Sequence, residues 1–419
     1  MKITIHRGTD QIGGCVTEYE CGGYRLFVDF GEQLPGAKKT KPLEIEGLTK
    51  GDLSKSALLI THYHGDHIGC IKDLPKELPI YMGKLGRDIQ LTLSEYLSYV
   101  DDEQNVIIEK LQTANSFSPG KPFLFGPFDI MPITIDHSAF DAYAFKIEAE
   151  GVRVFHTGDF RLHGFRSRNI KKMVEKYIGK VDYIVCEGTN VTRPNSSLLT
   201  EKDLQHQFEE ALNQRYGHIV YLSSTNIDRL FSLYHAALNA GVPFFVDAYQ
   251  KKIMDVVTDS NSLWGKSQLY HYGEYPPIVL LREGDSFKAN DKFKAVLGKK
   301  GYVLITRANP RFDKLIEQLP CKKVKYLSLW KGYLDEKKEA YNEALAKALG
   351  KDYIYLHTSG HCDVKSLRKF FSLLKPEAII PIHTDKPDRF VKLFSKEWNV
   401  IRLHDGETFS PTIETIDHL

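Results

Sequence analysis

Short runs of apolar and β-branched residues, separated by Gly, Asp and Ser, recur through the first half of the chain. Such runs predict strands, because a strand needs only a few residues and favours Val, Ile, Phe and Tyr. Strands are expected over residues 2–6, 15–20, 24–29, 57–61, 123–135, 152–156 and 183–186, and a helix with a polar break over 83–109.

The pattern changes near residue 195. Helical periodicity at 201–216, 226–240 and 313–319 alternates with short apolar runs at 218–223, 242–246, 278–281 and 303–305. Thr200 and Asp203 have the spacing of a capping box at the start of the first of these helices. Strands that alternate with helices predict a separate α/β lobe with a mostly parallel sheet.

The last part of the chain returns to the first pattern. A strand is expected at 353–356, a helix at 364–374 and a strand at 378–382 that Pro381 breaks. We therefore predict one domain formed by residues 1–194 and 346–419, interrupted by an inserted domain at 195–345.

A dense group of metal-ligand residue types follows the strand at 57–61. His62 and His64 alternate in an extended segment, so both can point toward one ion. Gly65 bends the chain, which directs Asp66 and His67 toward a second point nearby. Imidazole and carboxylate in this proportion suit Zn²⁺, or Mn²⁺. A row of surface histidines is the alternative interpretation.

Three further residues of these types, His137, Asp159 and Glu187, each come after another short apolar run. The ends of strands in one sheet can converge on a single edge site. His383 follows the strand at 378–382 in the same way. Asp29 ends the strand at 24–29 and is a candidate to hydrogen-bond and orient a metal ligand of segment 62–67. An aspartate with no role other than in a turn would give the same sequence pattern.

The amino-acid composition indicates the class of protein but does not identify its binding partners. With 419 residues the chain suggests two or three domains, and 42% hydrophobic and 26% charged residues are typical of a globular protein. A net charge of +2 excludes neither nucleic acid nor small anions. No apolar run is long enough to span a membrane, and the N-terminus has no secretory h-region. The six cysteines are scattered, which favours reduced thiols and a cytoplasmic location.

The segment from Lys288 to Lys338 is locally basic, with 14 Lys and Arg against 5 Asp and Glu. Aromatic residues, among them Tyr326, Trp330 and Tyr333, are interleaved with these charges. A solvated helix face and a groove for a phosphate backbone explain this equally well.

The ligand types suggest two metals that share one carboxylate. We assign His62, His64 and His137 to the first, Asp66, His67 and His383 to the second, and Asp159 to both. A pair of cations can stabilise the entering and leaving oxygens of an in-line displacement, and a shared water would lose its proton near neutral pH to give hydroxide.

The leaving oxygen then needs a proton. His361, oriented by Glu187, is the candidate acid, because a carboxylate partner raises the pKa of a histidine and fixes its tautomer. Ser359, Gly360 and His361 are the candidate phosphate contacts, since glycine permits close backbone approach. A plain turn at 359–360 is the alternative.

These residues resemble a known family. The motifs HYHGDH, DHSAFDAY, HTGDF, CEGTN, HTSGHCD and PIHT match, in order, those of the metallo-β-lactamase superfamily in its β-CASP nuclease branch, and most resemble ribonuclease J. The resemblance implies a metallo-β-lactamase αββα sandwich with an inserted β-CASP α/β domain, two Zn²⁺ ions, and hydrolysis of single-stranded RNA, as exonuclease or endonuclease. It implies family roles for Asp29, His62, His64, Asp66, His67, His137, Asp159, Glu187, His361 and His383. A histidine at the position of His383 is typical of RNA-directed members, where DNA-directed ones carry valine.

The chain departs from ribonuclease J at three places. Residues 247–250 replace a GRSM-like stretch, no QGEP-like loop occurs near 306–309, and the chain stops about 35 residues after His383 without a further domain. These three differences leave open how the chain recognises the 5′ end of RNA and which oligomer it forms. A homodimer is one possible oligomer. The alternatives are a DNA nuclease of the same fold, a small-molecule metallo-hydrolase acting on an ester, lactone or cyclic phosphodiester, and an RNA-binding subunit without activity.

Overall fold

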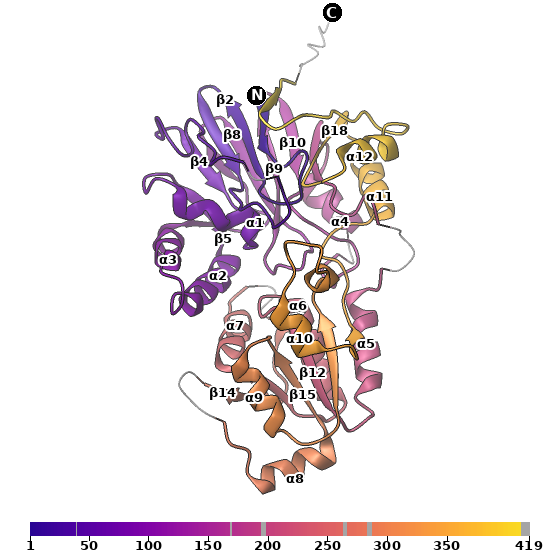
Figure 1. Ribbon diagram of the computed structural model, residues 1–419. Helices are drawn as coiled ribbons and strands as arrows, with labels where there is room; N and C mark the ends of the chain where they lie inside the picture. The colour runs from indigo at the N-terminus through magenta and orange to yellow at the C-terminus, as the bar shows by residue number, and fades with distance from the viewer. Residues whose placement is uncertain (39, 168–169, 194–197, 263–265, 283–286, 412–419) are drawn as a thin grey trace, which may run out of the picture. The chain divides into compact units, whose positions relative to one another are not determined.

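The computed structural model describes residues 1–38, 40–167, 170–193, 198–262, 266–282 and 287–411 (Figure 1). The chain forms two compact units. The first unit comprises Met1–Leu162, Arg166–Ser197 and Gly360–Leu419, and the second comprises His163–Phe165 and Leu198–Ser359. The second unit is therefore an insertion in the sequence of the first.

The first unit contains a seven-stranded sheet in the order β19-β1-β2-β3-β4-β5-β6. Strands β19, β1, β2 and β3 pair antiparallel, and β3 to β6 pair parallel. The strands are β1 (Lys2–Arg7), β2 (Val16–Cys21), β3 (Tyr24–Val28), β4 (Ser56–Leu59), β5 (Ile80–Gly83), β6 (Asn115–Phe117) and β19 (Glu407–Phe409).

A second, six-stranded sheet has the order β18-β11-β10-β9-β8-β7. Strands β18, β11 and β10 pair parallel, and β10 to β7 pair antiparallel. The strands are β7 (Phe123–Phe125), β8 (Phe128–Thr134), β9 (Tyr143–Ala149), β10 (Val152–His156), β11 (Tyr183–Glu187) and β18 (Ala378–Ile382).

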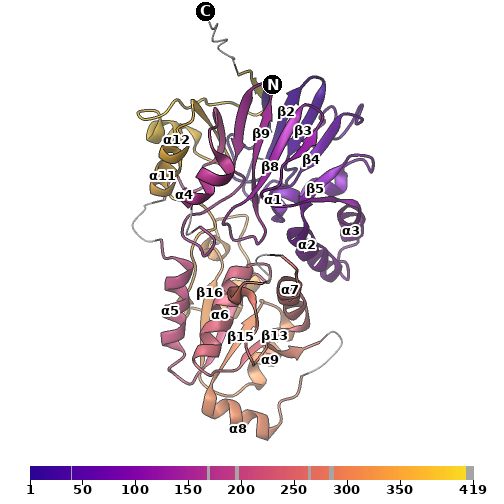
Figure 2. The same ribbon diagram turned by 180° about the vertical axis from the view of Figure 1, so that it is seen from behind.

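The two sheets enclose the main core of this unit. Val28 and Leu59 of the first sheet belong to one buried cluster with Val154 of the second. The next residue, Phe155, points to the opposite face, because side chains alternate along a strand, and joins a cluster with Phe370 of α11. Figure 2 shows α4, α11 and α12 on one side of the unit and α2 and α3 on the other.

Eight helical segments cover or connect these sheets in the described residues. They are α1 (Gly65–Ile68), η1 (Gly69–Asp73), α2 (Lys84–Leu97), α3 (Glu103–Thr113), α4 (Ile170–Met173), η2 (Val174–Ile178), α11 (Val364–Leu374) and α12 (Pro387–Phe394). The result is a helix–sheet–sheet–helix sandwich. None of the described helices has the length and apolar content to cross a membrane. All six cysteines are free thiols.

The second unit is built on one parallel sheet in the order β14-β13-β15-β12-β16-β17. Its strands are β12 (Gly217–Leu222), β13 (Phe244–Asp247), β14 (Ile278–Leu281), β15 (Tyr302–Thr306), β16 (Lys323–Ser328) and β17 (Ile354–Tyr355). Its helical segments are α5 (Glu201–Ala211), α6 (Ile227–Asn239), α7 (Ala248–Thr258), η4 (Gln268–Tyr270), α8 (Asp291–Lys300), α9 (Pro310–Gln318), η5 (Lys331–Leu334) and α10 (Glu343–Leu349). The predicted capping box of Thr200 and Asp203 starts α5.

The structure corrects the predicted elements at several points. The strand expected at 123–135 is a hairpin of β7 and β8, because Gly126 has a φ of 53° and turns the chain. Pro381 does not break β18: the strand lies at the edge of its sheet, where a missing N–H is tolerated. The second unit continues to Ser359, past the predicted boundary at 345, because β17 pairs with β16. The predicted boundary at 194 lies outside the described residues.

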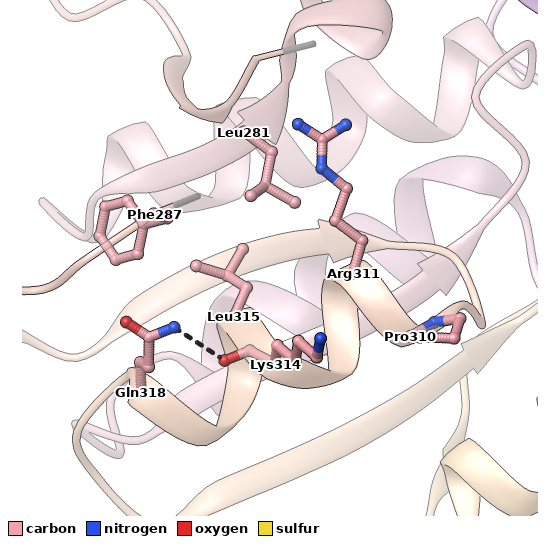
Figure 3. A pocket seen from close by; sticks show the side chains of 7 residues that line it. All are labelled: Leu281, Phe287, Pro310, Arg311, Lys314, Leu315 and Gln318. Atoms are coloured by element: carbon pink, nitrogen blue, oxygen red, sulfur yellow. Dashed lines mark hydrogen bonds between the residues drawn. The ribbon is translucent and has the colours of Figure 1, made fainter. Parts of the chain in front are cut away.

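A hollow of about 380 Å³ lies in the second unit between the end of β14 and α9 (Figure 3). It is lined by Leu281, Phe287, Pro310, Arg311, Lys314, Leu315 and Gln318. None of the metal-ligand residues predicted from the sequence lines it.

A buried carboxyl group beside α2 makes the stability of the first unit depend on pH. Asp141 accepts hydrogen bonds from the Gly86 amide and the Tyr143 hydroxyl, at 2.9 and 2.8 Å. Burial is the main cause that raises the pKa of Asp141 from 3.8 to about 6. Between these two values the unfolded chain loses this proton while the folded chain keeps it, so stability falls as pH rises through that window, by roughly 3 kcal/mol in total.

Replacing Asp141 by Asn should remove this contribution, because an amide stays neutral at both pH values. Asn also tolerates the φ of 58° at this position. We expect the urea unfolding midpoint of the variant, followed by circular dichroism, to depend less steeply on pH between 4 and 6.5. The exposed Asp129 on β8, replaced by Asn, is the matched control. Parallel pH curves for the wild type and Asp141→Asn would contradict this assignment.

Candidate metal centre

Three histidines converge where β4 ends and α1 begins. His62 lies in the extended segment after β4, and His64 is the N-cap residue of α1. His62 Nε2 lies 3.1 Å from His64 Nδ1, and His137 Nε2 lies 3.2 Å from the same atom. The three rings therefore direct one nitrogen each toward a common point.

Asp66, His67, Asp159 and His383 form a second group, whose ligand atoms all lie within 4.8 Å of one another. His383 Nε2 lies 3.2 Å from Asp66 Oδ2, and His67 Nε2 lies 3.1 Å from Asp159 Oδ2. The turn that carries Asp66 packs closely on a neighbouring loop: a Cβ added to Gly31 would lie 1.7 Å from the Asp66 carbonyl oxygen. Only glycine fits at that position.

Asp159 joins the two groups. Its Oδ2 atom lies within 4.0 Å of a ring nitrogen of each of five histidines, namely His62, His67, His137, His361 and His383. Its other oxygen, Oδ1, is buried and accepts no hydrogen bond from the described residues. A buried carboxylate oxygen without a donor is costly unless a cation is close to it.

The sequence-based prediction placed the site at the edge of one sheet, and the structure corrects this. His62 follows β4 of the seven-stranded sheet. In the six-stranded sheet, Asp159 and His383 follow β10 and β18, and Glu187 is the last residue of β11. The two sheets face each other across the core, so the ends of strands from both open onto the same place.

In four of these rings the nitrogen that faces away from the centre, Nδ1, is hydrogen-bonded. These hydrogen bonds assign the tautomer of each ring. The Nδ1–H groups of His67 and His137 donate to Asp29 Oδ2 and to the Gly360 carbonyl, each at 2.7 Å. Those of His62 and His383 donate to the hydroxyls of Thr61 and Thr189, at 3.0 and 2.8 Å. All four rings thus present Nε2 to the centre, the arrangement typical of histidines that bind a metal.

Thr61 and Thr189 were not among the residues predicted from the sequence, and Gly360 was predicted as a phosphate contact and not as the acceptor for His137. Thr61 directly precedes His62, and this adjacency was the one available signal. The other two contacts join residues far apart in the chain, 194 positions for Thr189 and His383 and 223 for His137 and Gly360.

Electrostatics favour neutral rings in the first group. Burial lowers the pKa of His62 and His137 well below the usual value, and neighbouring histidines lower it further. Burial also lowers the pKa of His64, to about 4. Neutral imidazole is the form that coordinates a metal.

The second group carries the negative charge. Burial alone would raise the pKa of Asp159, but His383, His67 and His361 outweigh burial and hold this pKa well below its usual value. Conversely, burial opposes the charge of His67, but the surrounding carboxylates, Asp159 first, raise its pKa well above the usual value. Lone pairs and negative charge gathered in one buried place match the donor set of divalent cations such as Zn²⁺.

His361 lies at the accessible side of this centre. Its Nδ1 is 3.2 Å from Glu187 Oε2, and its side chain is 20% exposed, whereas the Asp159 side chain is 2% exposed. Burial lowers the pKa of His361, but the charges of Glu187 and Asp159 outweigh burial and raise it. His361, Glu187, Asp159 and His383 also form a third group of possible ligand atoms.

The predicted phosphate contacts are placed in different units. Gly360 belongs to the first unit, where its carbonyl holds His137 and where an added Cβ would lie 2.5 Å from Ser138 Oγ. Ser359 belongs to the second unit, and its carbonyl accepts a hydrogen bond from His163 Nε2 at 2.8 Å. Phosphate binding by residues 359–361 stays a prediction.

Comparison with known proteins identifies the family. Residues 33–217 match the family described as "Beta-lactamase superfamily domain", and residues 353–402 match "Zn-dependent metallo-hydrolase RNA specificity domain". The chain belongs to the metallo-β-lactamase superfamily, in its β-CASP branch. The predicted fold class, an αββα sandwich with an inserted β-CASP α/β domain, is confirmed.

Curated relatives of this metallo-β-lactamase chain include three proteins named Ribonuclease J. The protein from Mycoplasma genitalium is 23% identical over 95% of the chain and 70% of its own length. Those from Sinorhizobium meliloti and Helicobacter pylori (strain J99) are each 22% identical, over 84% and 91% of the chain and 62% and 56% of their own lengths. The chain thus spans between 56% and 70% of these relatives.

A solved structure has the same fold. The crystal structure of a protein of unknown function from Enterococcus faecalis V583 matches 97% of the chain and 99% of its own, with a TM-score of 0.73 and 20% identity.

Asp29 should control how tightly the centre holds metal. Its carboxylate accepts from His67 Nδ1 and from the amide and hydroxyl of Thr61. Asn tolerates the φ of 63° at this position, but its NH₂ group would face His67 Nδ1 and favour the tautomer that carries its proton on Nε2. We expect Asp29→Asn to weaken zinc binding by about 10- to 100-fold, measured by competition with a chromogenic chelator. Asp52→Asn, at an exposed loop position, should leave the affinity unchanged, and an equal affinity for Asp29→Asn would rule out this role.

Proposed function

We propose that the chain is a metal-dependent ribonuclease that hydrolyses phosphodiesters of single-stranded RNA in the cytoplasm. One observation carries the proposal: nitrogens of five histidines lie within 4.0 Å of Asp159 Oδ2. In four of these rings a hydrogen bond at Nδ1 turns Nε2 toward the centre. The relatives named Ribonuclease J support the choice of RNA as substrate.

The residues present would hold two cations, with zinc as the first choice and manganese as the second. His62, His64 and His137 would hold one, Asp66, His67 and His383 the other, and Asp159 both. Two divalent cations bound in this way would act as Lewis acids and lower the pKa of an attacking water to about 7.

Side chains of the protein would orient the attacking water and protonate the leaving oxygen. Asp66, with a side chain that is 12% exposed, can orient the attacking water. His361 would give the proton on Nε2 to the leaving oxygen, while Glu187 accepts from Nδ1 and keeps the ring turned outward. The charge of Glu187 also favours the protonated form of His361.

Substrate digestion tests this function. Purified protein should cleave a labelled RNA when zinc or manganese is present and lose this activity in EDTA, and activity should return when metal is restored. RNA with 5′-monophosphate, 5′-triphosphate or circular ends separates exonuclease from endonuclease action. The proposal fails if the metal-loaded protein cleaves matched single-stranded DNA, a lactone or bis-p-nitrophenyl phosphate but not RNA. Light scattering of the same sample shows whether the chain forms a homodimer.

A further inference from the structure

The second unit exposes a cluster of aromatic side chains at the carboxyl ends of two adjacent strands. Trp330 lies between β16 and η5, Tyr333 lies in η5, and Tyr355 lies in β17, which pairs with β16. The three side chains are 37%, 38% and 37% exposed. In parallel sheets the carboxyl ends of the strands are where ligands usually bind.

Two lysines lie against these rings. Lys331 Nζ is 4.3 Å from the centre of the Tyr355 ring, and Lys338 Nζ is 5.1 Å from that of Trp330. The Trp330 and Tyr333 rings meet edge to face, with centres 5.6 Å apart. We call Trp330, Lys331, Tyr333, Lys338 and Tyr355 the aromatic–lysine surface.

The backbone holds the indole of Trp330 in place. A Cβ added to Gly332 would lie 2.2 to 2.4 Å from three atoms of the six-membered part of this ring. The ring therefore lies flat over Gly332 and occupies the space that a side chain would take. An exposed tryptophan that is fixed in this way loses little conformational freedom when a planar group stacks on it.

We propose that the aromatic–lysine surface binds single-stranded RNA. Bases stack on the rings of Trp330 and Tyr355 in place of the lysine side chains that lie over them, and Lys331 and Lys338 turn aside to hold the phosphates. The inference rests on the proposed function and names a binding surface for its substrate. Exposed rings with adjacent cations are the chemistry that binds single strands without reading their sequence. The segment from Lys288 to Lys338, with its 14 basic and 5 acidic residues, makes this part of the unit complementary to a polyanion.

Stacking rather than charge should dominate at this surface, because Asp335, Glu336 and Glu339 balance the lysines of the same turn. Loss of a ring should weaken binding at every salt concentration alike. Loss of both lysines should also make the dependence of log Kd on log salt less steep, by about 0.7 for each phosphate contact.

The test measures binding in EDTA, so that cleavage does not interfere. Trp264 and Trp398 are replaced by Phe, which leaves Trp330 as the single tryptophan of the chain. Titration with an oligouridylate 20-mer should quench its fluorescence. In the otherwise unmodified protein, fluorescence anisotropy with the same labelled RNA should show that Trp330→Ala and Tyr355→Ala each weaken binding by about 5- to 150-fold.

Two controls make the result specific. Trp330→Phe keeps a ring and should recover most of the affinity. Tyr275→Ala removes an aromatic side chain of the same unit that is 73% exposed but lies outside the surface, and should bind RNA like the wild type. Unfolding midpoints of all variants show whether the unit is intact.

The proposal is overturned if Trp330 is not quenched, if Tyr275→Ala weakens binding as much as Trp330→Ala, or if Trp330→Ala changes the oligomeric mass and not the RNA affinity. Failure of the proposed function is seen separately, as a metal-loaded wild type that does not cleave RNA. The binding data in EDTA are not affected by that result.

Discussion

Replacing Asp159 by Asn is expected to lower RNA turnover at least about a thousandfold, equivalent to roughly 4 kcal/mol of transition-state stabilisation, and to lower the bound metal. The substitution removes the negative charge that lies within 4.0 Å of five histidine nitrogens. It also places an amide among the Nε2 atoms that face inward. Both changes act on the residue that the two ligand groups share.

The measurement combines elemental analysis of the purified variant with RNA cleavage rates at saturating zinc. The control is Asp129→Asn, a change of the same type at an exposed position of β8, which should keep full metal content and activity. Circular dichroism shows whether the variant is folded. A folded Asp159→Asn protein with wild-type metal content and turnover would mean that Asp159 is not a ligand.

Replacing His361 by Gln should lower RNA turnover by about 10²- to 10⁴-fold, the usual contribution of a general acid, while the metal content stays that of the wild type. The ribose oxygen that leaves from RNA is a strong base and needs a proton, whereas p-nitrophenolate is stable without one. The same variant should therefore lose much less activity on bis-p-nitrophenyl phosphate. The ratio of the two losses is the quantity to measure.

This comparison separates two interpretations of His361. Its Nδ1 lies 3.2 Å from Glu187 and 3.7 Å from Asp159, so the ring could serve as an acid or as a ligand of the third group. Equal losses on both substrates, together with lost metal, would identify a ligand. As a control, His206→Gln changes a histidine on α5 of the second unit and should alter neither substrate's turnover.

Local sequence pattern was sufficient for many elements of the fold. The bounds of β10, β14, α11 and β18 agree with the predicted ones, because each is a short apolar run or a helical repeat with clear breaks at its ends. The capping box at Thr200 was also readable, since it depends on residues three positions apart. The strand β9 was missed, and it lies between the two predicted strands at 123–135 and 152–156.

The sequence by itself determined which residue types this protein can offer to a metal. HYHGDH places four of them within six residues, and spacing along an extended segment and a turn is a local property of the backbone. The tertiary structure alone decided that the ligands come from the ends of strands in two sheets and that Asp159 lies between them. It also decided which nitrogen each ring presents, because the partners that hold Nδ1 of His67, His137 and His383 lie 38, 223 and 194 residues away. No local pattern encodes contacts at those separations, since they exist only once both sheets have packed.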